Sequence, residues 1–402
     1  MDGRSFKKAS FLRGALLITL FFIGVTFVHE AKADGAYSFA PDVDNSGCID
    51  TGDLNLLGKN IHLANPTVGA DIDDNGTVDT TDLAYIAVAW PGCLPFWSPT
   101  TPPILRQQGD TIYKVKSGGI TRSYIVHVPS SYHGQAMPVV VNFHGASGQA
   151  SGQEAVISTM DASADANGYI VVYPNGSNIS LSPLDTTFFW NPGQGEQGYY
   201  KPLTRIKNID DVAFTGALLD KVEADYNINT KKVFVVGLSN GGMMAQRLAC
   251  HLANRITAMA SVEGNLWEFT SGCTPSRPMP TLLFSGTGDF WMPYSGGAST
   301  CASGNNWKSA QDVFDAWKTK NSCSTTSTTT TPSSDMSCQI FTGCASGAQV
   351  GMCTIQNGGH TWPGGGDYVA PSTDPQCSDP GYISTANGNQ VIWNFFNQFT
   401  LP

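Results

Sequence analysis

The feature that most constrains the fold of this chain lies at residues 232–250, where an apolar strand pattern passes into a helical pattern through the turn GLSNG (237–241). The apolar run 233–236 precedes the turn and an amphipathic run follows it. Glycine is required on both sides of Ser239 in such a turn, because a Cβ atom there would collide with a neighbouring strand or helix. The segment therefore predicts a strand, a tight turn that presents the serine hydroxyl, and a helix that starts directly after it.

Strand and helix patterns alternate through most of the remaining chain. Short runs rich in β-branched and aromatic residues predict strands, and longer runs with apolar residues at helical spacing predict helices. A chain in which strands alternate with helices is expected to form an α/β fold with a mainly parallel sheet. The expected strands are 124–128, 138–143, 169–173, 280–285 and 349–355, and the expected helices are 208–227 and 389–399.

A serine on a turn of this kind can be a nucleophile only with a general base, and the base needs an acid to orient it. In proteins whose catalytic serine lies on such a strand-to-helix turn, the serine comes first in the chain, then the acid, then the histidine. Only His251 and His360 follow Ser239. His251 would end the helix, about 18 Å along its axis from the serine. His360, in the loop GGHTWPG (358–364), is therefore the predicted base, with a purely packing role as the alternative.

The predicted acid is Asp289, which follows the expected strand 280–285. An exposed loop aspartate without a catalytic role is the alternative interpretation. Asp367 is a rival, but it follows His360 and so breaks the expected order.

Two backbone amides are predicted to stabilise a developing oxyanion. Asn240 starts the helix after the serine, and Ala146 follows the expected strand 138–143. Amide groups at these two places can point at the reacting oxygen. His144, in the same segment as Ala146, is expected to be a structural hydrogen-bonding residue rather than a base.

An acidic pattern, D-x-D-x-(N/S)-G-x-(I/V)-D-x-x-D-L, occurs at 42–54 and again at 71–83. Oxygen ligands at positions 1, 3, 5, 9 and 12 and the carbonyl of position 7 can converge on one calcium ion, and glycine at position 6 permits the sharp turn. The expected ligands are Asp42, Asp44, Ser46, Cys48, Asp50 and Asp53 in the first loop, and Asp71, Asp73, Asn75, Thr77, Asp79 and Asp82 in the second.

Both loops end in Asp, and each is followed, but not preceded, by a helical pattern. In these respects the segment resembles a type I dockerin, a calcium-binding module that docks onto cohesin domains. The resemblance implies structural calcium and a cohesin-like partner protein. Ser46 makes the first site the weaker, because a hydroxyl replaces an amide or carboxylate. A pair of acidic loops without metal is the alternative.

The N-terminal region has the features of a secretory signal peptide, with a basic start, an apolar run at 14–28 and Ala31-Lys32-Ala33 as the cleavage site. A retained membrane anchor is the alternative. The predicted organisation is a signal peptide at 1–33, a small helical dockerin-like module at 34–90, a proline-rich linker at 91–105 and an α/β domain at 106–402.

The formal net charge is −10, and loss of the leader, with five positive and two negative residues, leaves −13. Such acidity argues against nucleic acid and anionic membranes as partners. The ten cysteines of an exported chain indicate disulfides. Cys48–Cys93 and Cys250–Cys273 are the expected pairs, and the Ser/Thr-rich stretch 324–337 is expected to be a disordered insertion or a surface of the O-glycosylated kind.

Residues 106–402 resemble the secreted esterase and polyhydroxybutyrate-depolymerase family, which includes feruloyl and acetyl xylan esterases. The most specific matches are GLSNGGMM (237–244) and GGHTWPG (358–364), with shorter ones at 142–145, 190–191, 210–212 and 286–294. The resemblance implies a secreted serine esterase with an α/β-hydrolase fold, Ser239, Asp289 and His360 as its triad, and no cofactor for catalysis. The chain departs from the family at Ser285, where histidine is frequent, and lacks a Cys-Cys motif after Trp-Asn.

The dockerin-like module favours a plant cell-wall substrate, so feruloyl or acetyl esters of xylan are expected. Trp190 and Trp362 are expected to form an aromatic wall for a phenolic acyl group, with plain packing as the alternative. A polyester, either polyhydroxybutyrate or an aromatic polyester, is the alternative substrate. A calcium-dependent scaffold or adhesion protein with an inactive hydrolase domain is the alternative from another class.

Overall fold

The computed structural model describes residues 48–49, 92–93, 108–178, 188–193, 209–265, 273–302, 306–366, 377 and 381–402. The expected signal peptide, the expected calcium ligands other than Cys48, and most of the linker lie outside the described residues. Within the small unit, β1 (Cys48–Ile49) pairs antiparallel with β2 (Gly92–Cys93), and Cys48 stands opposite Cys93. That register is compatible with the expected Cys48–Cys93 disulfide, which stays a prediction.

The larger region is built on a ten-stranded sheet with the order β14-β15-β16-β11-β10-β9-β5-β6-β4-β3. Neighbours from β6 to β16 are parallel, and both edges of the sheet are antiparallel. The strands are β3 (Gly109–Ser117), β4 (Ile120–Val128), β5 (Met137–Phe143), β6 (Ile170–Pro174), β9 (Ile228–Leu238), β10 (Ala258–Val262), β11 (Thr281–Gly286), β14 (Ser327–Ser333), β15 (Met336–Phe341) and β16 (Val350–Ile355).

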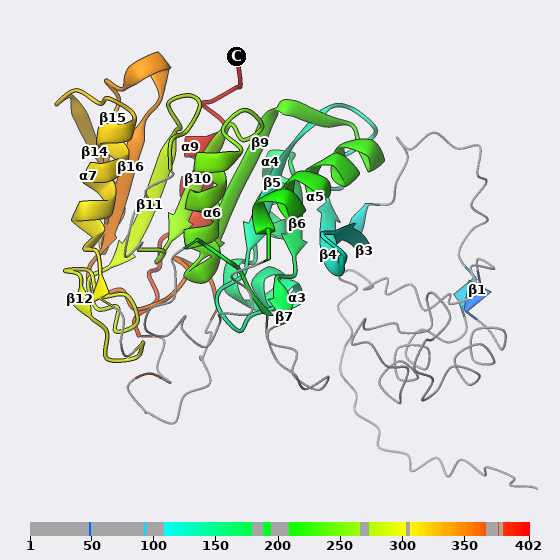
Figure 1. Ribbon diagram of the computed structural model, residues 1–402, viewed down its shortest axis with the longest axis horizontal. Coiled ribbons are helices and arrows are strands. Elements are labelled where there is room, and N and C mark those ends of the chain that lie inside the picture. The colour runs from blue at the N-terminus through cyan, green and yellow to red at the C-terminus, as the bar shows by residue number, and fades with distance from the viewer. Residues whose placement is uncertain are drawn as a thin grey trace, which may run out of the picture. The chain divides into compact units, whose positions relative to one another are not determined.

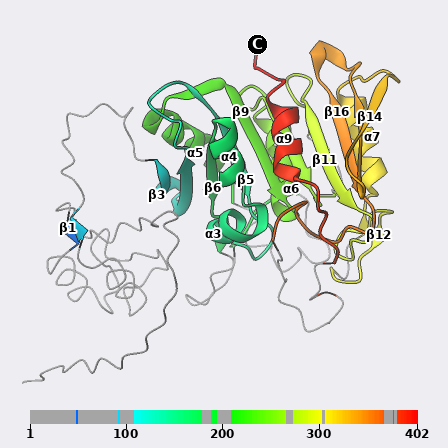
Figure 2. The same cartoon turned by 180° about the vertical axis from the view of Figure 1, so that it is seen from behind.

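Helices cover both faces of this sheet. In Figure 1 α5, α6 and α7 lie in front of it, and Figure 2 shows α4 and α9 on the opposite face. The helices are α3 (Ala150–Gly152), α4 (Asp161–Asn167), α5 (Asp211–Asp225), α6 (Asn240–His251), α7 (Ala310–Lys320) and α9 (Gly388–Phe396), with a π-helix at Gln153–Ser158 and a short 3-10 turn at Ala345–Gly347. Two-stranded pairs join β7 (Ser177–Asn178) to β8 (Phe188–Phe189) and β12 (Gly297–Ala298) to β13 (Asn306–Trp307).

The sheet has a hydrophobic core on each face, as the central strand β9 illustrates. Val233 and Val235 pack into the core that contains α5, α6 and α7, whereas Phe234 and Val236 pack into the core that contains α9. Successive side chains of a strand point to opposite faces, so a strand that is apolar throughout must be covered on both sides. The Phe234 ring stacks on Phe396 of α9, with 4.7 Å between ring centroids.

The expected fold class is confirmed, because the sheet is large, mainly parallel and covered by helices on both faces. All the expected strands and both helices are present, within a few residues of their predicted ends. The short strand β10 and the helices α4 and α7 were not predicted. Among the described residues, no helix combines the length and the apolar character needed to cross a bilayer.

The Ser/Thr-rich stretch 324–337 is a correction to the sequence analysis. It is not a disordered insertion, because β14 forms an antiparallel hairpin with β15, which pairs in turn with β16. The side chains of β14 are mostly exposed, as expected for an edge strand. Threonine is β-branched and polar, so it favours an exposed strand as much as a loop.

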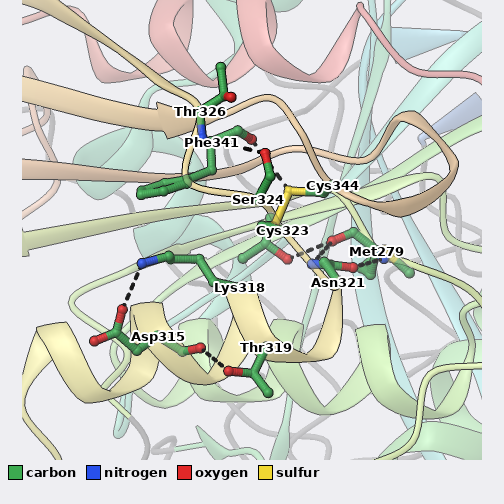
Figure 3. The surroundings of a disulfide bond; sticks show 11 residues. Met279, Asp315, Lys318, Thr319, Asn321, Cys323, Ser324, Thr326, Phe341 and Cys344 are labelled. Atoms are coloured by element: carbon green, nitrogen blue, oxygen red, sulfur yellow. Dashed lines mark hydrogen bonds and ion pairs between the residues drawn. A yellow bond between two sulfur atoms is a disulfide. The ribbon is translucent and has the colours of Figure 1, made fainter.

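Four disulfides join described residues, and two of them lie at the β15–β16 end of the sheet. The expected Cys250–Cys273 bond is present, and the others are Cys301–Cys377, Cys323–Cys344 and Cys338–Cys353. Figure 3 shows the surroundings of Cys323–Cys344, where the Asn321 side chain bonds the backbone of Met279. Cys338–Cys353 cross-links β15 to β16, the strand that leads to His360.

Candidate active site

Ser239 occupies a strained turn between β9 and α6. Its backbone has φ 57° and ψ −118°, a conformation that residues other than glycine rarely adopt. Two hydrogen bonds hold it there: its amide donates to the Val262 carbonyl at 2.8 Å, and its carbonyl accepts from Met243 at 2.9 Å. The turn therefore presents the serine side chain at the end of the sheet, as the GLSNG pattern predicts.

The glycines on either side of Ser239 allow the close approach of β5, β9 and α6. A Cβ at Gly237 would lie 2.5 Å from the Gly241 carbonyl carbon. A Cβ at Gly241 would overlap the carbonyl oxygen of Phe143, the last residue of β5. The collision expected from the sequence is thus a property of the folded turn.

Asp289, in the loop after β11, is held by three hydrogen bonds. Its Oδ1 accepts from the amides of Trp291 at 2.7 Å and Met292 at 2.9 Å. Its Oδ2 lies 2.7 Å from Nδ1 of His360. The Asp289 side chain is fully buried, so these donors replace water as the partners of its carboxylate.

His360 lies in the loop after β16, which is bonded directly to the Asp289 loop. The amide of Gly288 donates to Gly358 and that of Thr287 to Ile355, both at 2.9 Å. Glycine is required at 286 because a Cβ there would overlap the carbonyl oxygen of Gly358. With Nδ1 committed to Asp289, Nε2 of His360 is available to exchange a proton with another group.

Ser239, Asp289 and His360 all lie at the carboxyl ends of the parallel strands. They follow β9, β11 and β16, which run parallel with β10 between β9 and β11. The carboxyl ends of parallel strands meet at a common edge, where α/β proteins carry their sites. The structure brings Asp289 and His360 into contact and puts Ser239 at the same edge.

The two predicted oxyanion donors flank the serine. The loop after β5 lies against it, since a Cβ on Gly145 would be 3.6 Å from the Ser239 Cβ. Ala146 follows in that loop and is half-buried. Asn240 begins α6, and its buried side chain exchanges two hydrogen bonds with the Trp190 backbone, at 2.7 and 3.1 Å, which fixes the first turn of the helix.

His144 is a structural residue of this loop. Its Nδ1 lies 2.7 Å from the Gly145 carbonyl, and its Nε2 accepts from the Gly176 amide at 3.0 Å. Burial lowers its pKa to about 4, the Gly145 carbonyl opposes that shift, and the charge of Arg122 adds to it. The imidazole is therefore neutral at pH 7, and both ring nitrogens hold backbone groups.

A cavity of about 280 Å³ opens beside the nucleophile turn. Its lining includes Gly145 and Leu238, which flank Ser239, and the apolar side chains of Val156 and Ile157. A larger hollow of about 500 Å³ lies near Thr230 and Lys231, toward the other end of β9 from Ser239. Of these two cavities, the smaller lies beside Ser239.

The aromatic wall expected from Trp190 and Trp362 is a second correction. Trp190 is fully buried, and its indole N–H donates to the His144 carbonyl at 3.0 Å. Trp362 is 1% exposed, and its N–H donates to Asn389 at 2.9 Å. Neither ring can face a substrate; both hold site loops from within the core.

Other aromatic residues lie closer to His360 and Asp289. Trp291 is half-buried, with its ring centroid 6.2 Å from that of His360, and Phe290 is 43% exposed. Neither residue was predicted from the sequence, although both directly follow Asp289 in GDFWMPY. Their position directly after the predicted acid was the signal that could have identified them.

A buried ion pair involves two of the shorter stretches in which the chain resembles the esterase family, 190–191 and 210–212. Arg122 bonds Asp211 at 2.5 Å, and Asp211 also accepts from the Asn191 amide at 2.7 Å. The Arg122 guanidinium lies over the ring of Phe214, 3.4 Å from its centroid. Asp211 and Arg122 are both buried, so this pair anchors the Trp190-Asn191 segment rather than contacting a substrate.

Asp110, His127 and Asp161 are the described residues that could hold a metal, with ligand atoms within 4.8 Å of one another. Burial would lower the pKa of His127, but its hydrogen bond to Asp110 and the charges of Asp161, Asp110 and Asp165 raise it to about 9. The ion pairs of His127 with Asp110 and Asp161 join β3, β4 and α4.

No family model matches the chain. The chain is similar to feruloyl esterase B of Piromyces equi, with 29% identity over 287 residues, 70% of this chain and 46% of the relative. It is 28% identical over 295 residues to the putative esterase NocK of Nocardia uniformis subsp. tsuyamanensis. This match covers 67% of the chain and 79% of NocK. It is also 27% identical over 177 residues to the bifunctional acetylxylan esterase/xylanase XynS20E of Neocallimastix patriciarum. This match covers 44% of the chain and 22% of XynS20E.

The chain thus spans about half the length of feruloyl esterase B. Among solved structures, it is similar to an acetyl xylan esterase from Aspergillus awamori, with a TM-score of 0.42 and 14% identity over 62% of this chain and 94% of that one. The chain is also similar to a dienelactone hydrolase-like promiscuous phosphotriesterase, P91, from metagenomic libraries. The TM-score is 0.47 and the identity 14%, over 73% of this chain and 99% of that one.

The packing of the nucleophile turn predicts opposite effects for two helical glycines. Gly241→Ala forces a Cβ against the β5 backbone and should destabilise the fold by about 1–3 kcal/mol or more. Gly216→Ala, in α5 and with no neighbour within 4 Å, should be neutral or stabilising by up to about 1 kcal/mol. Chemical unfolding of both variants measures the difference, and equal effects would contradict the packing argument.

Proposed function

We propose that this chain, a relative of feruloyl and acetylxylan esterases, is a serine carboxyl-ester hydrolase. Ser239 is the nucleophile, His360 the general base and Asp289 the acid that orients it. The observation that carries the proposal is the 2.7 Å contact between Asp289 and His360, at the sheet edge where Ser239 has a strained backbone. A histidine oriented by a carboxylate, together with a serine on a strained strand-to-helix turn, is the arrangement that a serine hydrolase needs.

In the proposed reaction, Nε2 of His360 accepts the proton of the Ser239 hydroxyl as its oxygen attacks the ester carbonyl. The tetrahedral oxyanion is stabilised by the backbone amides of Asn240 and Ala146, the first at the positive end of α6. His360 then protonates the leaving alcohol. Water attacks the acyl-enzyme by the same route and releases the acid.

Asp289 acts through His360. Its carboxylate accepts Nδ1–H, which selects the tautomer with a free Nε2 and stabilises the imidazolium that forms during the reaction. The two backbone amides on Oδ1 prevent rotation of the carboxyl group. The histidine therefore needs no reorganisation when it receives the proton.

Two histidines follow the nucleophile and make a matched test. Ser239→Ala and His360→Ala should each lower turnover of a simple ester by at least about a thousandfold. His251→Ala, at the exposed end of α6, should leave turnover unchanged. The measurements are ester hydrolysis and labelling by a fluorophosphonate probe, with circular dichroism to verify folding.

The labelling result separates an enzyme from a calcium-dependent scaffold with an inactive hydrolase domain. A folded wild-type chain that stays unlabelled, under conditions that label a control esterase, would favour the scaffold. A folded His360→Ala variant with full activity would refute the assignment of the base.

For the substrate we propose feruloyl or acetyl esters of plant cell-wall xylan. The names of the relatives support this choice, as does the cavity of about 280 Å³ beside Ser239. Phe290 and Trp291 replace Trp190 and Trp362 as the candidates for binding a phenolic acyl group. A polyester, polyhydroxybutyrate or an aromatic one, is the alternative substrate.

Rates on methyl ferulate, acetylated xylan and polyhydroxybutyrate, measured side by side, distinguish these substrates. Trp291→Ala should lower kcat/KM for methyl ferulate about 3- to 10-fold more than for an acetyl ester, because one aromatic contact is lost. Comparable low rates on all three substrates would exclude the xylan-ester proposal. Equal losses on both esters would exclude Trp291 as a ferulate contact.

The remaining proposals concern export and the N-terminal repeat. We propose that the chain is secreted; disulfides such as Cys323–Cys344 and Cys338–Cys353 persist in oxidising compartments and support this. The repeat at 42–54 and 71–83 is proposed to bind structural calcium and to tether the enzyme to a cohesin-like protein.

Calcium titration of the full chain by calorimetry tests the repeat. Removal of calcium by chelation followed by titration should give binding at two sites, and Asp71→Ala with Asp73→Ala should abolish the tighter one. Ester hydrolysis should be unchanged by chelation, because no calcium ligand takes part in the chemistry. Absence of calcium binding would overturn the dockerin-like assignment.

A further inference from the structure

A buried glutamate lies next to the proposed acid and has no part in the mechanism above. Glu263 directly follows β10, between the strands that lead to Ser239 and Asp289. It is fully buried and has a φ of 45°, a conformation uncommon for residues other than glycine. Its amide donates to the Phe284 carbonyl at 3.0 Å, which fixes its backbone against β11.

The two carboxyl oxygens of Glu263 have different surroundings. Oε1 accepts from the Gly286 amide at 2.7 Å. Oε2 is buried and finds no hydrogen-bond donor in the described part of the chain. The carboxyl lies within side-chain hydrogen-bonding reach of Asp289. Two carboxylates cannot bond each other, because both are acceptors, so this contact requires a proton on one of them.

The hydrogen bonds decide which carboxyl carries the proton. Asp289 accepts from Trp291, Met292 and His360, so both of its carboxyl oxygens already have donors. Glu263 accepts from a single backbone amide, and its Oε2 has no donor among the described residues. Burial raises the pKa of Glu263 well above its ordinary value, and the charge and hydrogen bond of Asp289 raise it further. Glu263 is therefore the carboxyl that carries the proton.

We propose that Glu263 is a positioning residue of the esterase site, whose protonated carboxyl donates its Oε2 hydrogen to Asp289 and holds that carboxylate toward His360. This inference rests on the proposed function. The titratable groups it concerns are Asp289 and, through it, His360. A neutral donor at this position adds no second negative charge beside Asp289, and it supplies a fourth hydrogen bond to a carboxylate that water cannot reach.

The structure also shows why the donor comes from β10. The strand lies between β9 and β11, so the residue after it lies between the nucleophile turn and the acid loop. The amide of Gly286, which holds Oε1, belongs to the segment that leads to Asp289. Glu263 thus bridges the start of the acid loop and, through the proposed hydrogen bond, its carboxylate.

Two substitutions of similar size separate a hydrogen-bond donor from packing. Glu263→Gln keeps an acceptor for Gly286 and a neutral donor for Asp289, and should retain kcat/KM within about threefold. Glu263→Met fills similar space without a donor and should lower kcat, with KM little changed, about 10- to 100-fold, as expected for loss of one hydrogen bond to a charged group.

The pH profile gives a readout that packing alone would not move. Loss of the donor concentrates negative charge on Asp289, so Glu263→Met should shift the acid limb of kcat/KM to higher pH, whereas Glu263→Gln should not. Thermal unfolding of both variants verifies that they are folded at the assay temperature.

Each outcome decides the inference. If Glu263→Met matches wild type in rate and pH profile, or if Glu263→Gln is as impaired as Glu263→Met while folded, the inference is overturned. Fluorophosphonate labelling of the wild type keeps this separate from the proposed function. A wild type that is not labelled refutes the esterase, whereas a labelled wild type with unaffected variants refutes only the role of Glu263.

Discussion

The structure depends on a close contact between three backbone segments: the end of β5, the end of β9 and the first turn of α6. Gly237 and Gly241 permit this contact, since any Cβ would meet backbone atoms that cannot move independently. Because α6 starts so close to the sheet, Ser239 is forced into its uncommon conformation and its side chain projects beyond the strands. The local strain is maintained by the two cores that cover β9.

The site is assembled by backbone hydrogen bonding as much as by side chains. Loops after β11 and β16 bond each other through Gly288 and Gly358, and this register delivers Asp289 to His360. Buried tryptophans hold two of the site loops: Trp190 bonds the segment after β5, and Trp362, in the loop after β16, bonds Asn389 at the start of α9. Buried polar groups that are fully bonded specify one arrangement, because any other would leave them unsatisfied.

Much of this arrangement could be predicted from local patterns. The strand-turn-helix around Ser239 and the strands before Asp289 and His360 have strong local signals. β10 was missed because its sequence, AMASV, contains little of the β-branched and aromatic residues that mark strands. The β14–β15 hairpin was missed because threonine-rich segments suit both exposed strands and loops, and only pairing with β16 decides between them.

The order of Ser239, Asp289 and His360 can be read directly from the chain, and the local geometry of the turn at Ser239 follows from its neighbouring glycines. Which groups meet in space depends on how the strands are arranged in the sheet. Aromatic identity does not reveal burial, so Trp190 and Trp362 proved to be internal, while Trp291 lies against His360. Likewise, the neighbour of Asp289 is Glu263, from another strand, and such a contact follows from strand order, which is set by packing across the whole sheet.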